Sequence, residues 1–275
     1  MASVVTVNDI INLLDEMAPP ELAESWDNVG LMLGRRNKPV RKLLLALDMT
    51  QETVAQAVAK KADMLITHHP AIFHKLGNVT DADWQQELLL QLAENGVAVY
   101  SAHTNLDCVA NGVNSVLAKR LRLQDADVLD TVSGLGRIGE LAQPSKLHDF
   151  AVFVKKALQA DYLTVGDAGR KVKRVAVCGG AGADLIGLAL AQGADTLVTG
   201  DVKYHEAQQA VFSGLNIIDA GHQPTELPVL DDLADRLSLR FTEKHWDVAI
   251  QVARETLLLK HRSEEHTSEL QSHEP

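Results

Sequence analysis

Cysteines, aromatic residues and long apolar runs are all scarce in this chain of 275 residues. Its two cysteines, Cys108 and Cys178, provide no disulfide framework and favour a reducing, cytoplasmic location. No apolar run approaches the roughly 20 residues that span a bilayer, so a membrane protein is not expected. Residues 1–6 lack the basic segment and apolar core of a secretory signal, which also predicts a cytoplasmic protein.

Basic residues are in the minority: 26 Lys and Arg face 37 Asp and Glu, a formal net charge of −11. This balance argues against a face that binds nucleic acid. Apolar residues, in contrast, make up 46% of the chain. That fraction is enough for a sizeable core, in one large domain or in two α/β lobes.

The end of the chain has a composition of its own. Residues 262–275 resemble the in-frame translation of a sequencing-library adapter, and we hypothesise that they are a non-native tail. A natural polar tail is the competing interpretation. A genomic reading frame that encodes these residues would reject the first hypothesis.

Short apolar runs alternate with helical patterns along the chain. Strands are predicted at 42–48, 64–66, 97–100, 175–178, 196–199 and 215–218, and such continuous runs are typical of parallel strands covered on both faces. A polar, acidic stretch from Leu123 to about Ser133 predicts a boundary between lobes. We therefore predict an α/β fold of two linked three-layer lobes, with residues 1–125 in the first lobe and 126–261 in the second.

Two adjacent histidines, His68 and His69, follow the predicted strand at 64–66. Pro70 comes next and cannot donate to a sheet ladder, so the strand ends here. Neighbouring side chains on an extended segment point in opposite directions, so each imidazole can serve a different metal ion. Open α/β sheets place their sites at such strand ends. Ordinary loop histidines are the alternative interpretation.

The pattern recurs after two other strands. His103 follows the strand at 97–100, and Asp107, four residues later, suits either a hard oxygen ligand or the cap of the next helix. His222 follows the strand at 215–218 and precedes Pro224, which is at home in a first helical turn. Glu226 lies one turn after His222, so both can reach the same point. Glu226 as a helix-start charge is the alternative.

These strand ends together predict one metal site. The candidate ligands are His68, His69, Asp107, His222 and Glu226. A single ion needs three or four protein ligands, so five candidates favour two ions about 3.5–4 Å apart, bridged by one carboxylate. A single-ion site remains open as an alternative.

Three further features have two interpretations each. The glycine-rich residues 179–182 can hold a phosphate on backbone N–H groups or form a tight structural turn. His103 and His205 are candidates for proton transfer. For His205, the alternative interpretation is a histidine on the surface of a helix. Trp26 is expected to anchor the core, with a substrate-stacking ring as the alternative.

Taken in order, segments 25–31, 67–73, 101–107, 199–205 and 220–226 resemble the Nif-three-like dinuclear metal-centre family, many of whose members are named GTP cyclohydrolase 1 type 2. The resemblance implies two divalent metal ions (Zn, Fe or Mn) in the cleft between two α/β lobes. It also implies a ring-shaped homo-hexamer, and as metal ligands it implies His68, His69, Asp107, His222 and Glu226. Residues 241–247 and the helix-like segment 248–259 depart from the family pattern, so we expect the closing strand to be missing or altered.

The expected function is a metal-dependent hydrolase that acts on a nucleotide. In this hypothesis a water activated by two ions attacks C8 of a purine nucleotide, and ring opening releases formate. The alternative is a non-catalytic metal-binding scaffold or regulatory protein. Neither a nucleic acid nor a membrane is expected as a partner.

Overall fold

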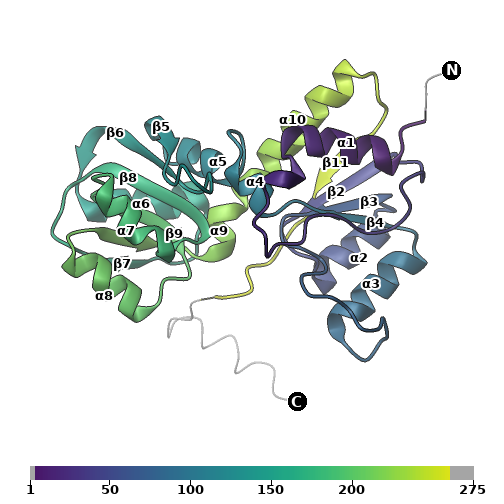
Figure 1. The fold of residues 1–275 in the computed structure, drawn as a ribbon, viewed down its shortest axis with the longest axis horizontal. Helices are drawn as coiled ribbons and strands as arrows, with labels where there is room; N and C mark the ends of the chain where they lie inside the picture. Colours follow the sequence, from purple (N-terminus) through teal and green to yellow (C-terminus); the bar gives the residue numbers. More distant parts are fainter. Residues whose placement is uncertain (1–3, 261–275) are drawn as a thin grey trace, which may run out of the picture.

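A computed structural model describes residues 4–260, which form two α/β lobes that lie side by side (Figure 1). Each lobe is a β-sheet with helices on both faces. The predicted α/β class with three layers in each lobe is therefore confirmed. Within residues 4–260, none of the helices combines the length and the apolar character that crossing a membrane requires.

The first lobe is built on a five-stranded sheet in the order β1-β4-β3-β2-β11. The central strands are parallel, and β1 closes one edge antiparallel to β4. Leu43 and Leu45 of β2 face one core cluster, whereas Leu44 faces the other, which explains the unbroken apolar run. The strands are β1 (Gly30–Leu33), β2 (Lys42–Ala46), β3 (Met64–Thr67), β4 (Ala98–Ser101) and β11 (Ala249–Val252).

Helices cover both faces of this sheet. Helices α1 and α10 share one core cluster with it, and α2 and α3 share the other. Thr6 caps α1 with a reciprocal bond to Asp9, which fixes where this amphipathic helix begins. The helices of the lobe are α1 (Val7–Met17), the short η1 (Pro20–Leu22), α2 (Gln51–Ala59), α3 (Trp84–Glu94), α4 (Thr104–Cys108) and α10 (Pro228–Glu243).

The second lobe has a six-stranded mixed sheet in the order β5-β6-β8-β9-β10-β7. Strands β8, β9 and β10 are parallel, and the outer strands are antiparallel. Helices α5 and α6 cover one face, and α7 and α8 cover the other. The elements are α5 (Val113–Arg120), β5 (Gln124–Val128), β6 (Arg137–Ser145), α6 (Leu147–Leu158), β7 (Thr164–Gly166), β8 (Val172–Ala181), η2 (Ala183–Leu185), α7 (Ile186–Ala191), β9 (Thr196–Gly200), α8 (Tyr204–Phe212), β10 (Asn216–Asp219) and α9 (His222–Glu226).

Helix α5 joins the two cores. Val113 and Val116 belong to the core of the first lobe, whereas Leu117 and Leu121 at its other end belong to the core of the second. The lobes therefore share buried apolar contacts, which oppose their separation because opening them would expose this surface to water.

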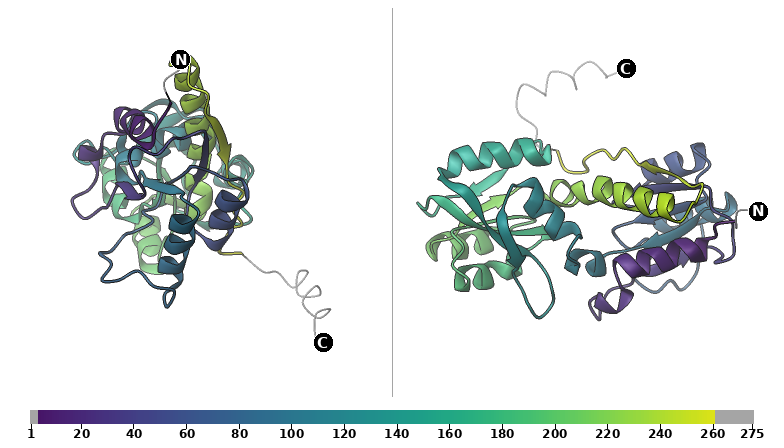
Figure 2. Two further views of the ribbon diagram at one scale, coloured as in Figure 1. Left: turned by 90° about the vertical axis from the view of Figure 1, so that its right-hand side faces the viewer. Right: turned by 90° about the horizontal axis from the view of Figure 1, so that it is seen from above.

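The chain returns to the first lobe after α9. The predicted second lobe, residues 126–261, therefore extends too far toward the C-terminus. Leu233, Leu237 and Phe241 of α10 are buried in the first core, and β11 pairs in parallel with β2. From above, α10 runs from the junction into the first lobe, and the chain after β11 comes back alongside it (Figure 2). The second lobe also begins earlier than predicted, because β5 starts at Gln124.

The expectation of a helix-like segment at 248–259 and a missing closing strand is wrong. Ala249–Val252 forms β11, with Ala249 opposite Lys42 and Val252 opposite Leu45. Ile250 and Val252 pack against the first core. Their spacing of two residues is the one expected for an edge strand with one buried face. The proposed non-native tail, residues 262–275, lies outside the described residues.

Candidate metal centre

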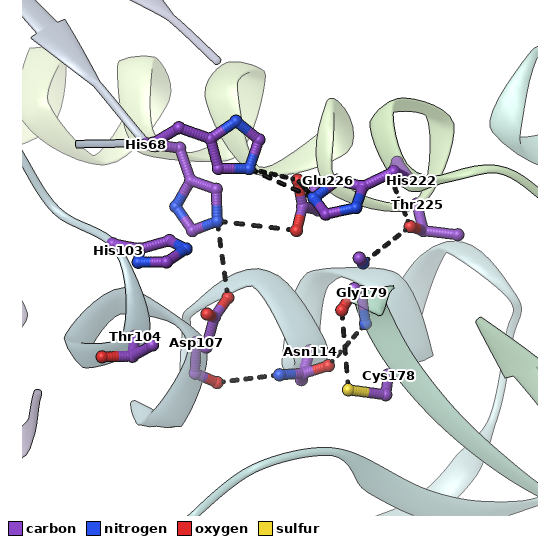
Figure 3. A network of polar contacts seen from close by, with 12 residues as sticks. His68, His103, Thr104, Asp107, Asn114, Cys178, Gly179, His222, Thr225 and Glu226 are labelled. Carbon is purple, nitrogen blue, oxygen red and sulfur yellow. Dashed lines mark hydrogen bonds and ion pairs between the residues drawn. The ribbon is translucent and has the colours of Figure 1, made fainter. Parts of the chain in front are cut away.

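The carboxyl ends of parallel strands from both sheets lead to the junction of the lobes, where the side chains of His68, Asp107, His222 and Glu226 point toward one another (Figure 3). His68 and His69 directly follow β3, and His103 lies between β4 and α4. From the second lobe, β10 leads through Gly221 into α9, which carries His222 and Glu226 at its two ends. Parallel strands share one carboxyl edge, so residues far apart in sequence come together there.

The nitrogen and oxygen atoms of these side chains approach each other closely. His68 Nε2 lies 3.6 Å from Asp107 Oδ1 and 3.7 Å from Glu226 Oε1. His69 Nε2 lies 3.1 Å from Glu226 Oε2, and His222 Nε2 lies 3.3 Å from the same oxygen. The nitrogens of His69 and His222 are themselves 3.3 Å apart. All five predicted ligands thus lie in one cluster.

His103 joins this cluster from the first lobe. Ligand atoms of His68, His69 and His103 lie within 4.8 Å of one another. A second group with the same spacing consists of His69, His222 and Glu226. Groups of this composition and spacing could hold a metal ion.

Each histidine is oriented by a bond at its other ring nitrogen. Nδ1–H of His68 donates to the carbonyl oxygen of Ala102 at 2.8 Å, and a carbonyl can only accept. The other three rings pair Nδ1 with an aspartate: His69 with Asp48 at 2.7 Å, His222 with Asp201 at 2.7 Å and His103 with Asp27 at 2.9 Å. This pattern is typical of metal-ligating histidines, since it leaves the Nε2 lone pair for the ion.

The cluster contains buried acceptors without a donor. His68 is 2% exposed and Glu226 is 4% exposed. His68 Nε2 and Glu226 Oε2 have no hydrogen-bond partner. With Nδ1 of His68 carrying the proton, the neutral ring presents Nε2 to the carboxylate as a second acceptor, and a cation between them, either a metal ion or a proton, satisfies both. The residues therefore fit a metal ion.

The pKa values in the metal-free protein reflect the same need for positive charge. Burial acts to lower the pKa of His69, but the nearby carboxylates of Asp48 and Glu226 outweigh it and raise the pKa to about 10. The nearby carboxylate of Glu226 raises the pKa of His222 to about 9. The three imidazoles, against the effect of burial, hold the pKa of Glu226 well below its ordinary value. Protons thus take the place of a metal ion, and metal uptake must displace them.

Three of the four backbone N–H groups of residues 179–182 already have partners and are not free to hold a phosphate. The backbone N–H groups of Gly179, Gly180 and Gly182 donate to side-chain oxygens of Asn114, Thr225 and Thr199. The structural interpretation of this turn is therefore the correct one.

Gly180 has a direct role in the shape of the site. Its φ is +64°, and a Cβ at this position would collide with Glu226 Oε1 and lie 3.1 Å from His222 Nε2. The turn therefore needs glycine so that the end of β8 can approach the two side chains of α9.

Two sequence expectations differ from the structure. His205 lies on the exposed side of α8, where its ring contacts Tyr204 and Gln208 of the same helix, so it is not part of the cluster. Trp26 is 58% exposed instead of being a core anchor.

The three aspartates that orient histidines, Asp27, Asp48 and Asp201, were not predicted from the sequence. Asp48 and Asp201 each come just after a strand of a parallel sheet. That position is the signal that could have identified these two residues.

A cavity of about 460 Å³ opens beside the cluster, with His69 and His222 in its wall. Its wall also carries four aspartates: Asp48, Asp161, Asp201 and Asp219. Among its described lining residues, none is Lys or Arg. The cavity therefore favours cations over anions.

Two three-layer α/β lobes with a histidine–carboxylate cluster at their junction define a class of metal-site protein. The chain belongs to the Duf34/NIF3 family (NGG1p interacting factor 3), whose model matches residues 5–256. It is 36% identical to a GTP cyclohydrolase 1 type 2 homolog of Clostridium perfringens, over 90% of this chain and 96% of that one. It is 30% identical to the NIF3 homolog of Schizosaccharomyces pombe, over 88% of this chain and 92% of that one.

Solved structures show the same fold. A hypothetical protein of Staphylococcus aureus superposes with a TM-score of 0.89 at 29% identity, over 94% of this chain and 100% of that one. A Bacillus cereus protein related to NIF3 gives a TM-score of 0.87 at 26% identity, over 92% of this chain and 98% of that one.

Proposed function

We propose that the chain is a metal-dependent hydrolase that acts on a nucleotide and binds two divalent ions, Zn, Fe or Mn. The supporting observation is the position of Glu226 between two sets of ligand atoms. Its Oε1 faces His68, which also faces Asp107, and its Oε2 faces His69 and His222. One carboxylate with an oxygen toward each set suits the bridge of a two-ion site.

Two divalent ions would supply Lewis acidity and bring the pKa of a water close to neutral. The chain itself supplies orientation and proton transfer. His103 is the candidate proton carrier, because Asp27 fixes its Nδ1 and its ring lies 5.2 Å from that of His68. His205 is the less suitable candidate, since it lies on exposed α8.

The charge of the cavity bears on how a nucleotide would lie. Asp48, Asp161, Asp201 and Asp219 oppose a bare triphosphate there. We therefore propose that the purine ring, with its reactive C8, faces the cluster and that the phosphates lie outside this cavity. The relatives named GTP cyclohydrolase 1 type 2 homolog make GTP the first substrate to test.

The test is turnover together with metal content. Purified protein should hold two equivalents of metal and release formate from GTP, with activity lost to a chelator. Glu226→Gln should lose metal and activity, whereas the control Glu243→Gln, on a side chain 57% exposed at the end of α10, should keep both. Full GTP turnover by Glu226→Gln after loss of metal would reject the mechanism.

Two alternative outcomes have distinct signatures. One equivalent of metal per chain with turnover would indicate a single-ion hydrolase. Stoichiometric metal without turnover of any nucleotide or phosphoester would favour a scaffold or regulatory protein. The ring-shaped homo-hexamer and the cytoplasmic location stay predictions, which sedimentation equilibrium and cell fractionation would check.

A further inference from the structure

We propose that Trp26, Phe73 and His103 form a stacking site for the planar ring of the substrate; we call these three residues the aromatic wall. The proposal rests on the proposed function, because it assigns a place to the base of the nucleotide. It starts from Trp26, which is 58% exposed, and Phe73, which is 39% exposed. Exposed aromatic rings that neighbour each other are a common feature of binding sites.

The rings of the wall lead from the surface to the metal cluster. The centroids of Trp26 and Phe73 are 6.0 Å apart with planes inclined at 54°. Trp26 and His103 are 6.1 Å apart at 75°, and His103 and His68 are 5.2 Å apart. Trp26 and Phe73 are tilted and not stacked on each other, which leaves ring faces for a third ring. A ligand ring on this wall would lie next to the cluster.

The wall is held in place by polar contacts on both sides of Trp26. The side chain of Asp27 is 0% exposed, and its carboxylate accepts from His103 Nδ1, from the Thr104 hydroxyl and from the Thr104 N–H. The N–H of Glu24 donates to the same hydroxyl at 2.9 Å. These bonds fix the turn at 24–27, so the exposure of Trp26 follows from a fixed backbone conformation.

The loop of Phe73 is tied to the same turn. The side-chain amide of Asn28 donates to the carbonyl oxygen of Ile72 at 2.5 Å. Trp26 and Phe73 therefore keep their mutual position before a ligand arrives. A preformed pair of rings loses little conformational freedom on binding, which favours affinity.

The chemistry of the wall suits a nucleobase better than a phosphate or a sugar. Every base offers a π-face, and stacking on aromatic side chains needs no particular hydrogen-bond pattern. The acidic cavity beside His69, which none of the three wall residues lines, disfavours the anionic part of a nucleotide. The wall is thus the place where the uncharged, planar part of such a ligand gains contact.

Binding of guanosine, which has no phosphate, tests the proposal in the full-length protein by titration calorimetry. Trp26→Ala should weaken guanosine binding about tenfold or more, and Phe73→Ala should weaken it as well. Trp26→Phe should retain most of the affinity, because it keeps an aromatic face. The control Trp84→Ala, at a tryptophan that is 69% exposed at the start of α3, should change nothing.

Three results would overturn the proposal: no binding of guanosine to the wild-type protein, wild-type affinity in Trp26→Ala, or an equal loss in Trp84→Ala. Wild-type affinity in Trp26→Ala together with a changed oligomeric state would identify the wall as a contact between subunits. The proposed hydrolase is judged separately: absence of metal-dependent GTP turnover would reject the hydrolase, while guanosine binding lost in Trp26→Ala would still support the wall.

Discussion

Replacement of Gly180 by alanine tests whether the end of β8 shapes the metal site. A Cβ at this position collides with Glu226 Oε1, and ordinary contact would require the carboxylate to move by about 1 Å. Metal–oxygen bonds are only roughly 2.0–2.2 Å long, so a shift of this size breaks the ligand geometry. We expect metal affinity to fall about 10–100-fold, or roughly 1.4–2.7 kcal/mol.

The control must separate this collision from backbone strain. Gly193 has a φ of +77°, close to the +64° of Gly180, but a Cβ there meets nothing within 4 Å. Both alanine variants should lose roughly 1–2 kcal/mol of stability from the left-handed backbone. Only Gly180→Ala should lose metal affinity, measured by competition with a chelating dye, alongside thermal melts of the metal-free proteins. Wild-type metal affinity in Gly180→Ala would refute the reasoning.

Three further predictions concern the groups around the cluster. Asp48→Asn and Asp201→Asn should each weaken metal binding about 10–100-fold, because His69 and His222 lose the carboxylates that orient them. Wild-type metal affinity of these variants in the competition with the chelating dye would contradict this. Metal affinity should fall from pH 9 to pH 6, because His69 and His222, with pKa values of about 10 and about 9, hold protons that compete with the metal more strongly as the pH falls. A flat pH profile would disagree. Burial raises the pKa of Glu255 to about 7 from 4.5, so its contribution to stability is present below pH 4.5 and is lost as the pH rises to 7. The free energy of unfolding, measured with urea on the metal-free protein at pH 5 and pH 8, should therefore fall less between these pH values in Glu255→Gln than in the wild-type protein. An equal fall in both proteins would count against this prediction.

The sequence predicted what depends on local pattern. Apolar runs located the parallel strands, and the positions of His68, His103 and His222 after three of them predicted which side chains would meet. Parallel strands align their carboxyl ends, so a residue that follows a strand in sequence is placed at the shared edge. This geometric rule is why the ligand candidates could be gathered before the fold was known.

What the sequence did not predict depends on contacts between distant segments. Asp48 ended one predicted strand and Asp201 followed another, but only the folded chain places them beside His69 and His222. Trp26 reads as a core residue by its type, but the bonds of Asp27 hold its turn at the surface. β11 was missed because its partner, β2, lies at the other end of the chain, although Ile250 and Val252 carry its two-residue period.

The route of the chain bears on how the two lobes act together at the site. The second lobe is inserted into the first between α4 and α10, and the chain passes between the lobes at two places, along α5 and from α9 into α10. A ligand candidate lies just before each passage: Asp107 in α4 precedes α5, and Glu226 in α9 precedes α10. A change in the angle between the lobes would therefore separate Glu226 from His68 and Asp107. Since a metal ion binds only when these groups are close, metal affinity should report the relative position of the lobes, and bound metal should stabilise both together.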